Sequence, residues 1–239
     1  ATAMVEKGRK LGRPMVEGTW IIDDLGEGDL QFDNGICGLA MIAAYELSGD
    51  EGFLESARRA AEWAITRPLV PNWNYNAFSA RLLARLYVTT RDSRYLEEAR
   101  RKFQLGVLPG QTETGRWLDP HNARTPYHAI LATALVDYVE ALELAVAPDA
   151  ADVRSALVLA LDNLALQTIA YGASNVHELL PLEAFYRGVK LGGARSDWCD
   201  AVKVNLNVLT PELCARFARE LGHLPETLPY GILALDHDR

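Results

Sequence analysis

The sequence has few cysteines, no excess of basic residues and no long uninterrupted apolar run. Its three cysteines, Cys37, Cys199 and Cys214, form neither a CxxC pair nor zinc-type spacing with histidine, so we expect them to be small buried side chains. A net charge of -8 argues against nucleic acid and anionic membrane surfaces as partners. No window approaches the ~18 to 20 apolar residues that span a bilayer, which predicts a soluble protein.

What remains is the composition of a globular protein, with 49% hydrophobic and 23% charged residues in a chain of 239. We expect a single domain over residues 1–239. The chain begins at Ala1 without an initiator Met and shows no signal peptide, which suits a mature product or a fragment. The compartment, whether periplasmic, secreted or cytoplasmic, is left open.

An internal repeat is the strongest pattern in the chain. The stretch FDNGICGLAMIAAYELSGDEGFLESARR, from Phe32, aligns with YNAFSARLLARLYVTTRDSRYLEEARR, from Tyr75, at a constant offset of 42 residues that brings Asn34 onto Asn76. Repeats of about 40 residues indicate stacked supersecondary units, each too small to bury its own apolar face.

Each unit predicts two helices of different character. The first, such as AFSARLLARLY, is apolar or small over most of its circumference, whereas the second, such as FLESARRAAEWAI, is amphipathic. We therefore expect inner helices covered by outer helices, with Asp50 and Asp92 capping the outer ones and Asp33 capping the first inner one. Further units start near Thr125 and near residue 175.

The predicted fold class is all-α, with repeated helical hairpins that close into a toroid or stack into an open one. Four hairpins cover residues 32–207. An N-terminal segment with an acidic loop precedes them at 1–31, and a C-terminal helix and tail follow at 208–239.

The pattern Asn-(Gly/Ala)…Tyr…(Gly/Arg)-Asp…(Phe/Tyr)-Leu-Glu…Ala-Arg-Arg resembles the hairpin repeat of the (α/α) toroid, six-hairpin glycosidase-like superfamily. That superfamily includes unsaturated glucuronyl hydrolases, other glycoside hydrolases, sugar epimerases and polysaccharide lyases. The resemblance covers roughly residues 30–190 and implies carbohydrate metabolism with a saccharide substrate. A full ring needs twelve helices, whereas about eight or nine are predicted here. The ring is therefore incomplete, or the chain is a fragment, or a missing segment or a second copy in a homo-oligomer completes it.

In such a toroid the segments that precede the inner helices gather at one mouth, and here they are 20–34, 71–76, 111–128 and 172–178. Aromatic faces stack on sugar rings, and amide, imidazole and guanidinium groups bond to their hydroxyls. The alternative is a purely structural role, in which the aromatic residues pack the loops onto the ring. The candidate substrate-binding residues are Trp20, Trp73, Asn74, Tyr75, Asn76, Arg116, Trp117, His121, Arg124, Tyr127, His128 and His177.

Glycosidic cleavage uses one carboxylic acid as proton donor and a second carboxylate as base or nucleophile. Asp23 or Asp24 is the candidate for one role and Asp119 for the other. A polysaccharide lyase using the Asn, His, Tyr and Arg residues of the same segments is an alternative, and so is a helical-repeat module that binds glycan or protein without catalysis.

The acidic residues of segment 20–34 match known metal-binding motifs poorly, and we expect no metal or cofactor. Asp23-Asp24-Leu25-Gly26-Glu27 resembles the DDxxD/E magnesium motif of class I isoprenoid synthases, but its glycines disfavour the helix that this motif needs. An EF-hand loop fails because glycines occupy ligand positions. Arg81 and Arg85, one turn apart on an apolar helix, are expected to pair structurally or reach an edge, with an anion site in the ring lumen as the alternative.

Overall fold

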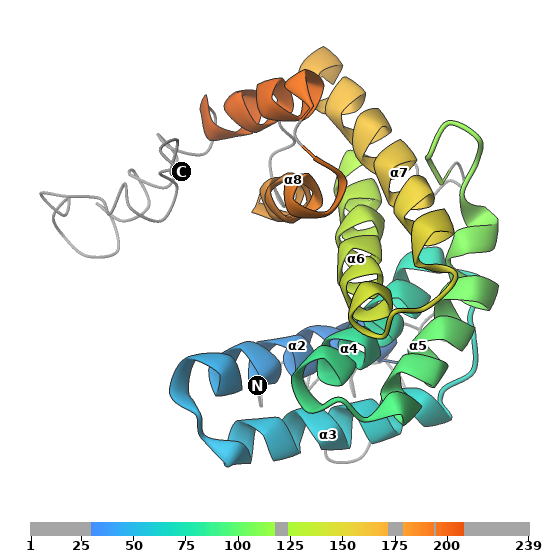
Figure 1. Cartoon of the computed structure of the whole chain (residues 1–239), viewed down its shortest axis with the longest axis vertical. Helices are drawn as coiled ribbons and strands as arrows, with labels where there is room; N and C mark the ends of the chain where they lie inside the picture. The colour runs from blue at the N-terminus through green and yellow to red at the C-terminus, as the bar shows by residue number, and fades with distance from the viewer. Residues whose placement is uncertain (1–29, 118–123, 172–178, 194, 208–239) are drawn as a thin grey trace, which may run out of the picture.

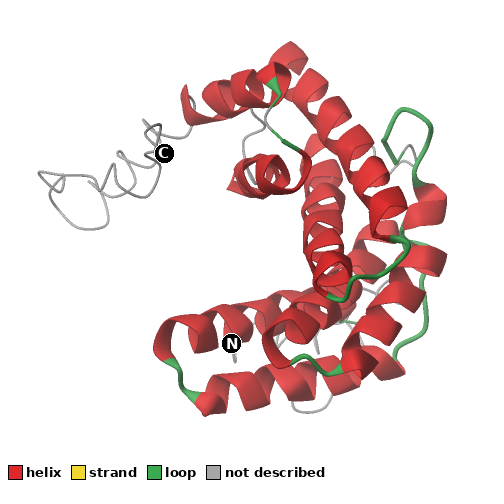
Figure 2. Ribbon diagram, in the orientation of Figure 1, coloured by secondary structure: helices red, strands yellow, loops and turns green. Residues whose placement is uncertain are grey.

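The computed structural model describes residues 30–117, 124–171, 179–193 and 195–207. Helices make up most of them, with short connections between (Figure 2). Within these ranges there is no β-strand, and the one isolated β-bridge joins Gln111 and Trp117. The predicted all-α class is therefore confirmed. The elements are α2 (Gln31–Ser48), α3 (Glu51–Thr66), α4 (Trp73–Thr90), α5 (Ser93–Gly106), the 3₁₀ turn η1 (Leu108–Gly110), α6 (Thr125–Leu144), α7 (Ala150–Tyr171), α8 (Leu179–Gly192) and a helix at 196–207.

The helices form two rows that follow an open arc (Figure 1). In the inner row α2 packs against α4, α4 against α6, and α6 against α8. In the outer row α3 contacts α2 and α4, α5 contacts α4 and α6, and α7 contacts α6 and α8. The arc runs from α2 and α3 at one end to the helix at 196–207 at the other.

The first two inner helices, α2 and α4, run in the same direction, because their contacts advance together along both helices. A Cβ atom on Gly35 of α2 would lie 2.8 Å from Phe78 of α4, and one on Gly38 would lie 2.7 Å from Leu82. These glycines let the two backbones approach closely. The ion pairs that join α4, α6 and α8, described below, advance in the same order. The helices also turn along the row: in Figure 1, α6 stands upright, α2 lies across the view and α8 is seen end-on.

The caps of the outer helices are confirmed. Asp50 accepts a hydrogen bond from the Gly52 amide at 2.8 Å, and Asp92 accepts one from the Arg94 amide at 3.0 Å. The cap predicted at Asp33 is wrong, since α2 begins at Gln31 and Asp33 lies in its first turn.

The core is densest around α6, in which every residue from His128 to Val139 is buried. The outer helix α5 buries one face, and its Phe103 ring stacks on Tyr138 of α6 with centroids 4.1 Å apart. The first inner helix differs: α2 buries Gln31, Gly35, Gly38 and Ile42 but leaves a flank open. The inner helices are thus buried where a neighbour stands on both sides.

The prediction for the cysteines is wrong for the two that the structure describes. Cys37 on α2 and Cys199 in the 196–207 helix are both exposed free thiols. Cys37 is exposed because it lies on the open flank of α2. Cys214 lies outside the described residues.

By length and composition α7 could cross a membrane, with a mean hydropathy of 1.3 over an 18-residue window. Among the described helices it alone meets that test. However, α7 packs against α6 and α8 and buries Leu157, Leu161 and Leu164 in the core. Other apolar residues of α7 remain exposed, among them Leu159, Leu166 and Ile169.

Candidate functional site

Part of the predicted site lies outside the described residues. The positions concerned adjoin the amino ends of α2, α6 and α8 in the sequence, and their roles stay predictions. They are Trp20, Asp23, Asp24, Asp119, His121 and His177.

The amino end of α4 carries the Asn-rich segment. Residues 71–76 were predicted to precede the helix, but α4 begins at Trp73 because the Asn72 side chain caps it by accepting a hydrogen bond from the Asn74 amide at 3.2 Å. Trp73 and Tyr75 are half-buried. The first turn of α4 therefore places an aromatic ring on either side of Asn74 in the sequence.

Asn74 has an unusual side chain at this position. It is only 2% exposed, and its amide nitrogen Nδ2 has no acceptor among the described residues. A buried donor left without an acceptor costs about 1–3 kcal/mol. A hydroxyl or carboxylate oxygen brought to this point by a ligand would recover that free energy.

Asn76, by contrast, is used by the fold. Its Nδ2 donates to the carbonyl oxygens of Val70 at 2.8 Å and Gly106 at 2.9 Å, and its Oδ1 accepts from the Val70 amide at 3.0 Å. Asn34, its counterpart in the first repeat, donates to the Ala60 carbonyl of α3 at 2.9 Å. The repeated asparagine therefore ties an inner helix to its outer partner.

Trp117 and His128 are both fully buried. The Trp117 Nε1 donates to the Val107 carbonyl at 2.8 Å, and its ring meets His128 edge to face. His128 Nδ1 lies 2.8 Å from the Gln167 amide nitrogen, which donates to it, so His128 is the neutral tautomer protonated on Nε2. In this arrangement neither ring offers a face to a ligand.

Burial also determines the pKa of His128. Removal from water disfavours the imidazolium and lowers the pKa of His128 to about 3, and the positive charge of Arg116 acts in the same direction. A neutral imidazole with so low a pKa cannot supply a proton near neutral pH.

The other predicted residues near α6 are more accessible. Arg124 is exposed, and Arg116 and Tyr127 are half-buried. The loop that carries Arg116 is held against α7, where Gln111 donates to the Ala156 carbonyl at 2.9 Å. Arg116, Arg124 and Tyr127 can therefore meet a ligand that approaches the amino end of α6.

A cluster of charged side chains joins the inner helices farther along the row, and we call it the inner-helix ion cluster. Its members come from α2, α4, α6 and α8 and comprise three arginines and four carboxylates. They are Glu46, Arg81, Arg85, Asp137, Glu140, Glu183 and Arg187.

The fully buried Asp137 lies at the centre of this cluster. It pairs with Arg81 and, at 2.5 Å, with Arg187, while Arg85 lies 3.7 Å away. Burial alone would raise the pKa of Asp137, but these arginines hold it below its usual range. Arg187 also contacts Glu140 at 2.5 Å, so α4, α6 and α8 are bound through shared charges.

The inner-helix ion cluster is a structural brace with no free acid/base pair. Glu140 and Glu183 are partly exposed, but each is already bound to arginine. Arg81 and Arg85 each form an ion pair with a carboxylate, which confirms the structural role expected from the sequence. The sequence analysis did not identify these carboxylates. A signal was present, because Asp137 and Glu140 lie one turn apart on an apolar helix, just as Arg81 and Arg85 do.

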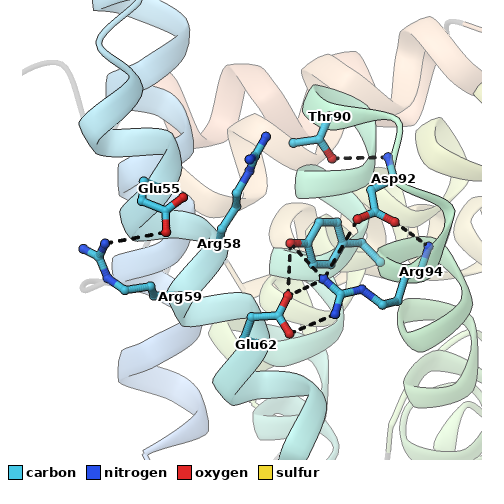
Figure 3. A pocket seen from close by; sticks show the side chains of 8 residues that line it. Glu55, Arg58, Arg59, Glu62, Thr90, Asp92 and Arg94 are labelled. Atoms are coloured by element: carbon cyan, nitrogen blue, oxygen red, sulfur yellow. Dashed lines mark hydrogen bonds and ion pairs between the residues drawn. The ribbon is translucent and has the colours of Figure 1, made fainter.

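A shallow groove on the outer row lies between α3 and α5 (Figure 3). Its volume is about 380 Å³, and its charges largely pair with each other: Arg94 bonds Glu62, and Arg59 lies 3.9 Å from Glu55. Arg58 has no ion-pair partner among the described residues. The groove is lined by both arginines and carboxylates, together with Thr90 and Tyr95.

The described residues contain no group of three or more His, Cys, Asp or Glu side chains that could hold a metal ion. No family model matches the chain, and no curated protein or solved structure matches it. The resemblance to the six-hairpin glycosidase-like superfamily therefore stays a prediction from the sequence.

Proposed function

We propose that this chain is a carbohydrate-active enzyme of the (α/α) toroid type that acts on an oligosaccharide or a uronic-acid-containing glycan. The observation that carries the proposal is the buried Asn74 side chain at the amino end of α4, whose Nδ2 has no acceptor among the described residues. Sugars present many hydroxyl oxygens, and an amide donor can bind one of them.

The toroid architecture is supported by the two rows of helices. The inner helices α2, α4 and α6 each pack against the outer helix that follows, and α2 and α4 run in the same direction. In a toroid the free backbone N–H groups at the amino ends of the inner helices would gather at one end, where they favour oxygen ligands and anions. Arg116, Arg124 and Tyr127 approach that end from α6 and the loop before it.

Cleavage in the proposed site uses two carboxylic groups, one as proton donor and the other as base or nucleophile. Asp23 or Asp24, which precede α2, and Asp119, which precedes α6, are the candidates. The carboxylates of the inner-helix ion cluster are already bound to arginine, which supports assigning the chemistry to these segments instead.

The test is a polysaccharide panel that reads reducing ends and absorbance at about 235 nm, where the unsaturated product of a lyase absorbs. The variants Asp24→Asn and Asp119→Asn are expected to lose turnover and keep the fold, with Asp152→Asn on α7 as the matched control. Full activity of both variants would refute the assigned chemistry. Unfolding of either variant would assign that carboxylate to the fold.

A lyase mechanism would draw on a smaller set of residues than the sequence suggested. Asn76 and the Nδ1 atom of His128 are already bonded within the fold, so the residues proposed to bind the uronate are Asn74 and Arg124. A rise in absorbance without matching hydrolysis would select this version.

A second candidate function is a glycan-binding module without catalysis. It is favoured by the open arc in Figure 1, because an incomplete ring encloses its ligand less and excludes less water. Titration calorimetry that detects saccharide binding without product formation would select it over the enzyme.

A further inference from the structure

Glu183 is the most exposed of the described carboxylates that pair with Arg81 or Arg187. Its side chain is 37% exposed, whereas the side chains of Arg81 and Arg187 are 12% and 16% exposed. Arg81 Nη2 donates to Glu183 Oε1 at 2.6 Å, and Arg187 Nη1 donates to the same oxygen at 3.0 Å. One carboxylate oxygen, open to solvent through its side chain, therefore lies where two guanidinium groups from α4 and α8 converge.

Other contacts hold these two guanidinium groups in place. Arg81 bonds the fully buried Asp137 through Nε, and Arg187 bonds Asp137 through Nη2 and Glu140 through Nε at 3.2 Å. None of these bonds uses Arg81 Nη2 or Arg187 Nη1. If the Glu183 side chain rotates into solvent, both donors stay aimed at the point that its oxygen leaves, and a ligand would find them already ordered.

The charges of the inner-helix ion cluster favour an anion at that point once Glu183 has left it. With Glu183 in place, three arginines face four carboxylates, and without it the two signs balance. Guanidinium groups bind carboxylate oxygens through short, charge-assisted hydrogen bonds. A carboxylate from another molecule can therefore replace both bonds that Glu183 makes.

We propose that Arg81 and Arg187 form a binding site for the carboxylate group of a ligand, and that Glu183 occupies this site as an internal competitor. A ligand carboxylate binds when the Glu183 side chain turns away, so Glu183 lowers the affinity of the site for weakly binding anions. The proposal does not rest on the glycan function, because the carboxylate alone is recognised.

The test compares acetate binding to the wild type and to Glu183→Ala. Acetate is titrated into isotope-labelled protein, and NMR follows the Nε–H signals of Arg81 and Arg187. Acetate should bind Glu183→Ala at least about tenfold more tightly than the wild type, because the affinity of a site rises with the fraction of time for which it is free. Acetamide, which has the same shape without the charge, should shift neither signal.

Two further variants make the comparison specific. Glu183→Gln keeps a neutral acceptor of the same shape, so its affinity for acetate should lie between those of the wild type and Glu183→Ala. Glu62→Ala is the matched control, because Glu62 is 47% exposed and forms an ion pair with one arginine, Arg94. It should bind acetate no more tightly than the wild type.

Three results would overturn the proposal. They are equal acetate affinity of the wild type and Glu183→Ala, acetamide binding as tight as that of acetate, and a gain in Glu62→Ala as large as in Glu183→Ala. If Glu183→Ala does not fold, as judged by circular dichroism, Glu183→Gln decides the question. A folded Glu183→Gln that binds acetate no better than the wild type would then show that Glu183 is no competitor.

Discussion

Replacing Asp137 with asparagine removes the fully buried carboxylate of the inner-helix ion cluster while keeping its shape. Asp137 touches Arg81 and Arg187 and lies 3.7 Å from Arg85, so it compensates charge from both α4 and α8. The asparagine side chain would still accept hydrogen bonds from one arginine, but its NH₂ group would face the other. We expect a folded protein of lower stability.

The size of the loss follows from burial. Breaking a buried ion pair by removing one partner costs about 3–5 kcal/mol. Glu183 and Glu140 still bind Arg81 and Arg187 in the variant, so we expect the lower end, about 3 kcal/mol. The matched control is Glu62→Gln, which breaks the exposed pair with Arg94 and should cost much less than Asp137→Asn, because solvent screens the two charges.

Urea unfolding of the three proteins, followed by circular dichroism, measures both values. The pH dependence supplies a further check. Because the pKa of Asp137 is below its usual range, its contribution is present above about pH 4 and is lost as the pH falls further. The stability difference between wild type and Asp137→Asn should therefore shrink in acid. If Asp137→Asn lowers the free energy of unfolding by less than about 1 kcal/mol at neutral pH, the inner-helix ion cluster does not brace the fold.

Three more residues give independent predictions. Lys102 is fully buried, and burial lowers its pKa to about 8. The free energy of unfolding should therefore rise by about 3 kcal/mol between pH 8 and about 10.5, because the unfolded chain binds the proton more tightly over that range. In urea titrations the variant Lys102→Met should not show this rise. Asn76→Ala leaves the Val70 and Gly106 carbonyls without their donor and should cost about 2–3 kcal/mol in thermal unfolding, whereas an unchanged midpoint would contradict the tie. His128, with a pKa of about 3, should stay neutral in NMR titrations down to about pH 4, and a midpoint near 6.5 would show that the ring is open to water.

Local patterns predicted the helices well, because their causes lie within a few residues. Asp50 and Asp92 cap the helices that begin immediately after them, as their position predicted. Asp33 failed because the Asn34 amide already bonds the Leu30 carbonyl at 2.9 Å, which starts the helix earlier. That start depends on the backbone at Leu30, which adopts a left-handed conformation that no residue preference predicts.

Long-range partners were beyond the sequence. Arg81 bonds carboxylates 56 and 102 residues away, and only the packing of α4, α6 and α8 selects them. Cys37 was expected to be buried because it belongs to no CxxC pair or zinc-type spacing, but α2 is the first inner helix among the described residues and keeps one flank open. Position in the row, and not the local pattern, decides the exposure of this thiol.

The sequence identified residues of the types that bind sugars, but it did not distinguish those available to a ligand from those used by the fold. Trp117, Asn76 and His128 are the kinds of residue that bind sugars, yet each is buried and bonded within the fold. Amides and aromatic rings satisfy backbone groups and fill cores as readily as they bind ligands. The hydrogen bonds distinguish Asn74, whose Nδ2 has no acceptor among the described residues, from Asn76 two residues later, whose Nδ2 is bonded.

The most direct test of the central proposal is titration of wild type and Asn74→Ala with the glycans of the panel, followed by calorimetry. We expect at least one saccharide to bind the wild type and to bind Asn74→Ala at least about tenfold more weakly, because the variant lacks the amide donor. Asn74→Ala should also unfold at the same temperature as the wild type or higher, since its donor has no acceptor to lose. Equal affinity of the two proteins, or no binding to any glycan, would contradict a saccharide site at the amino end of α4.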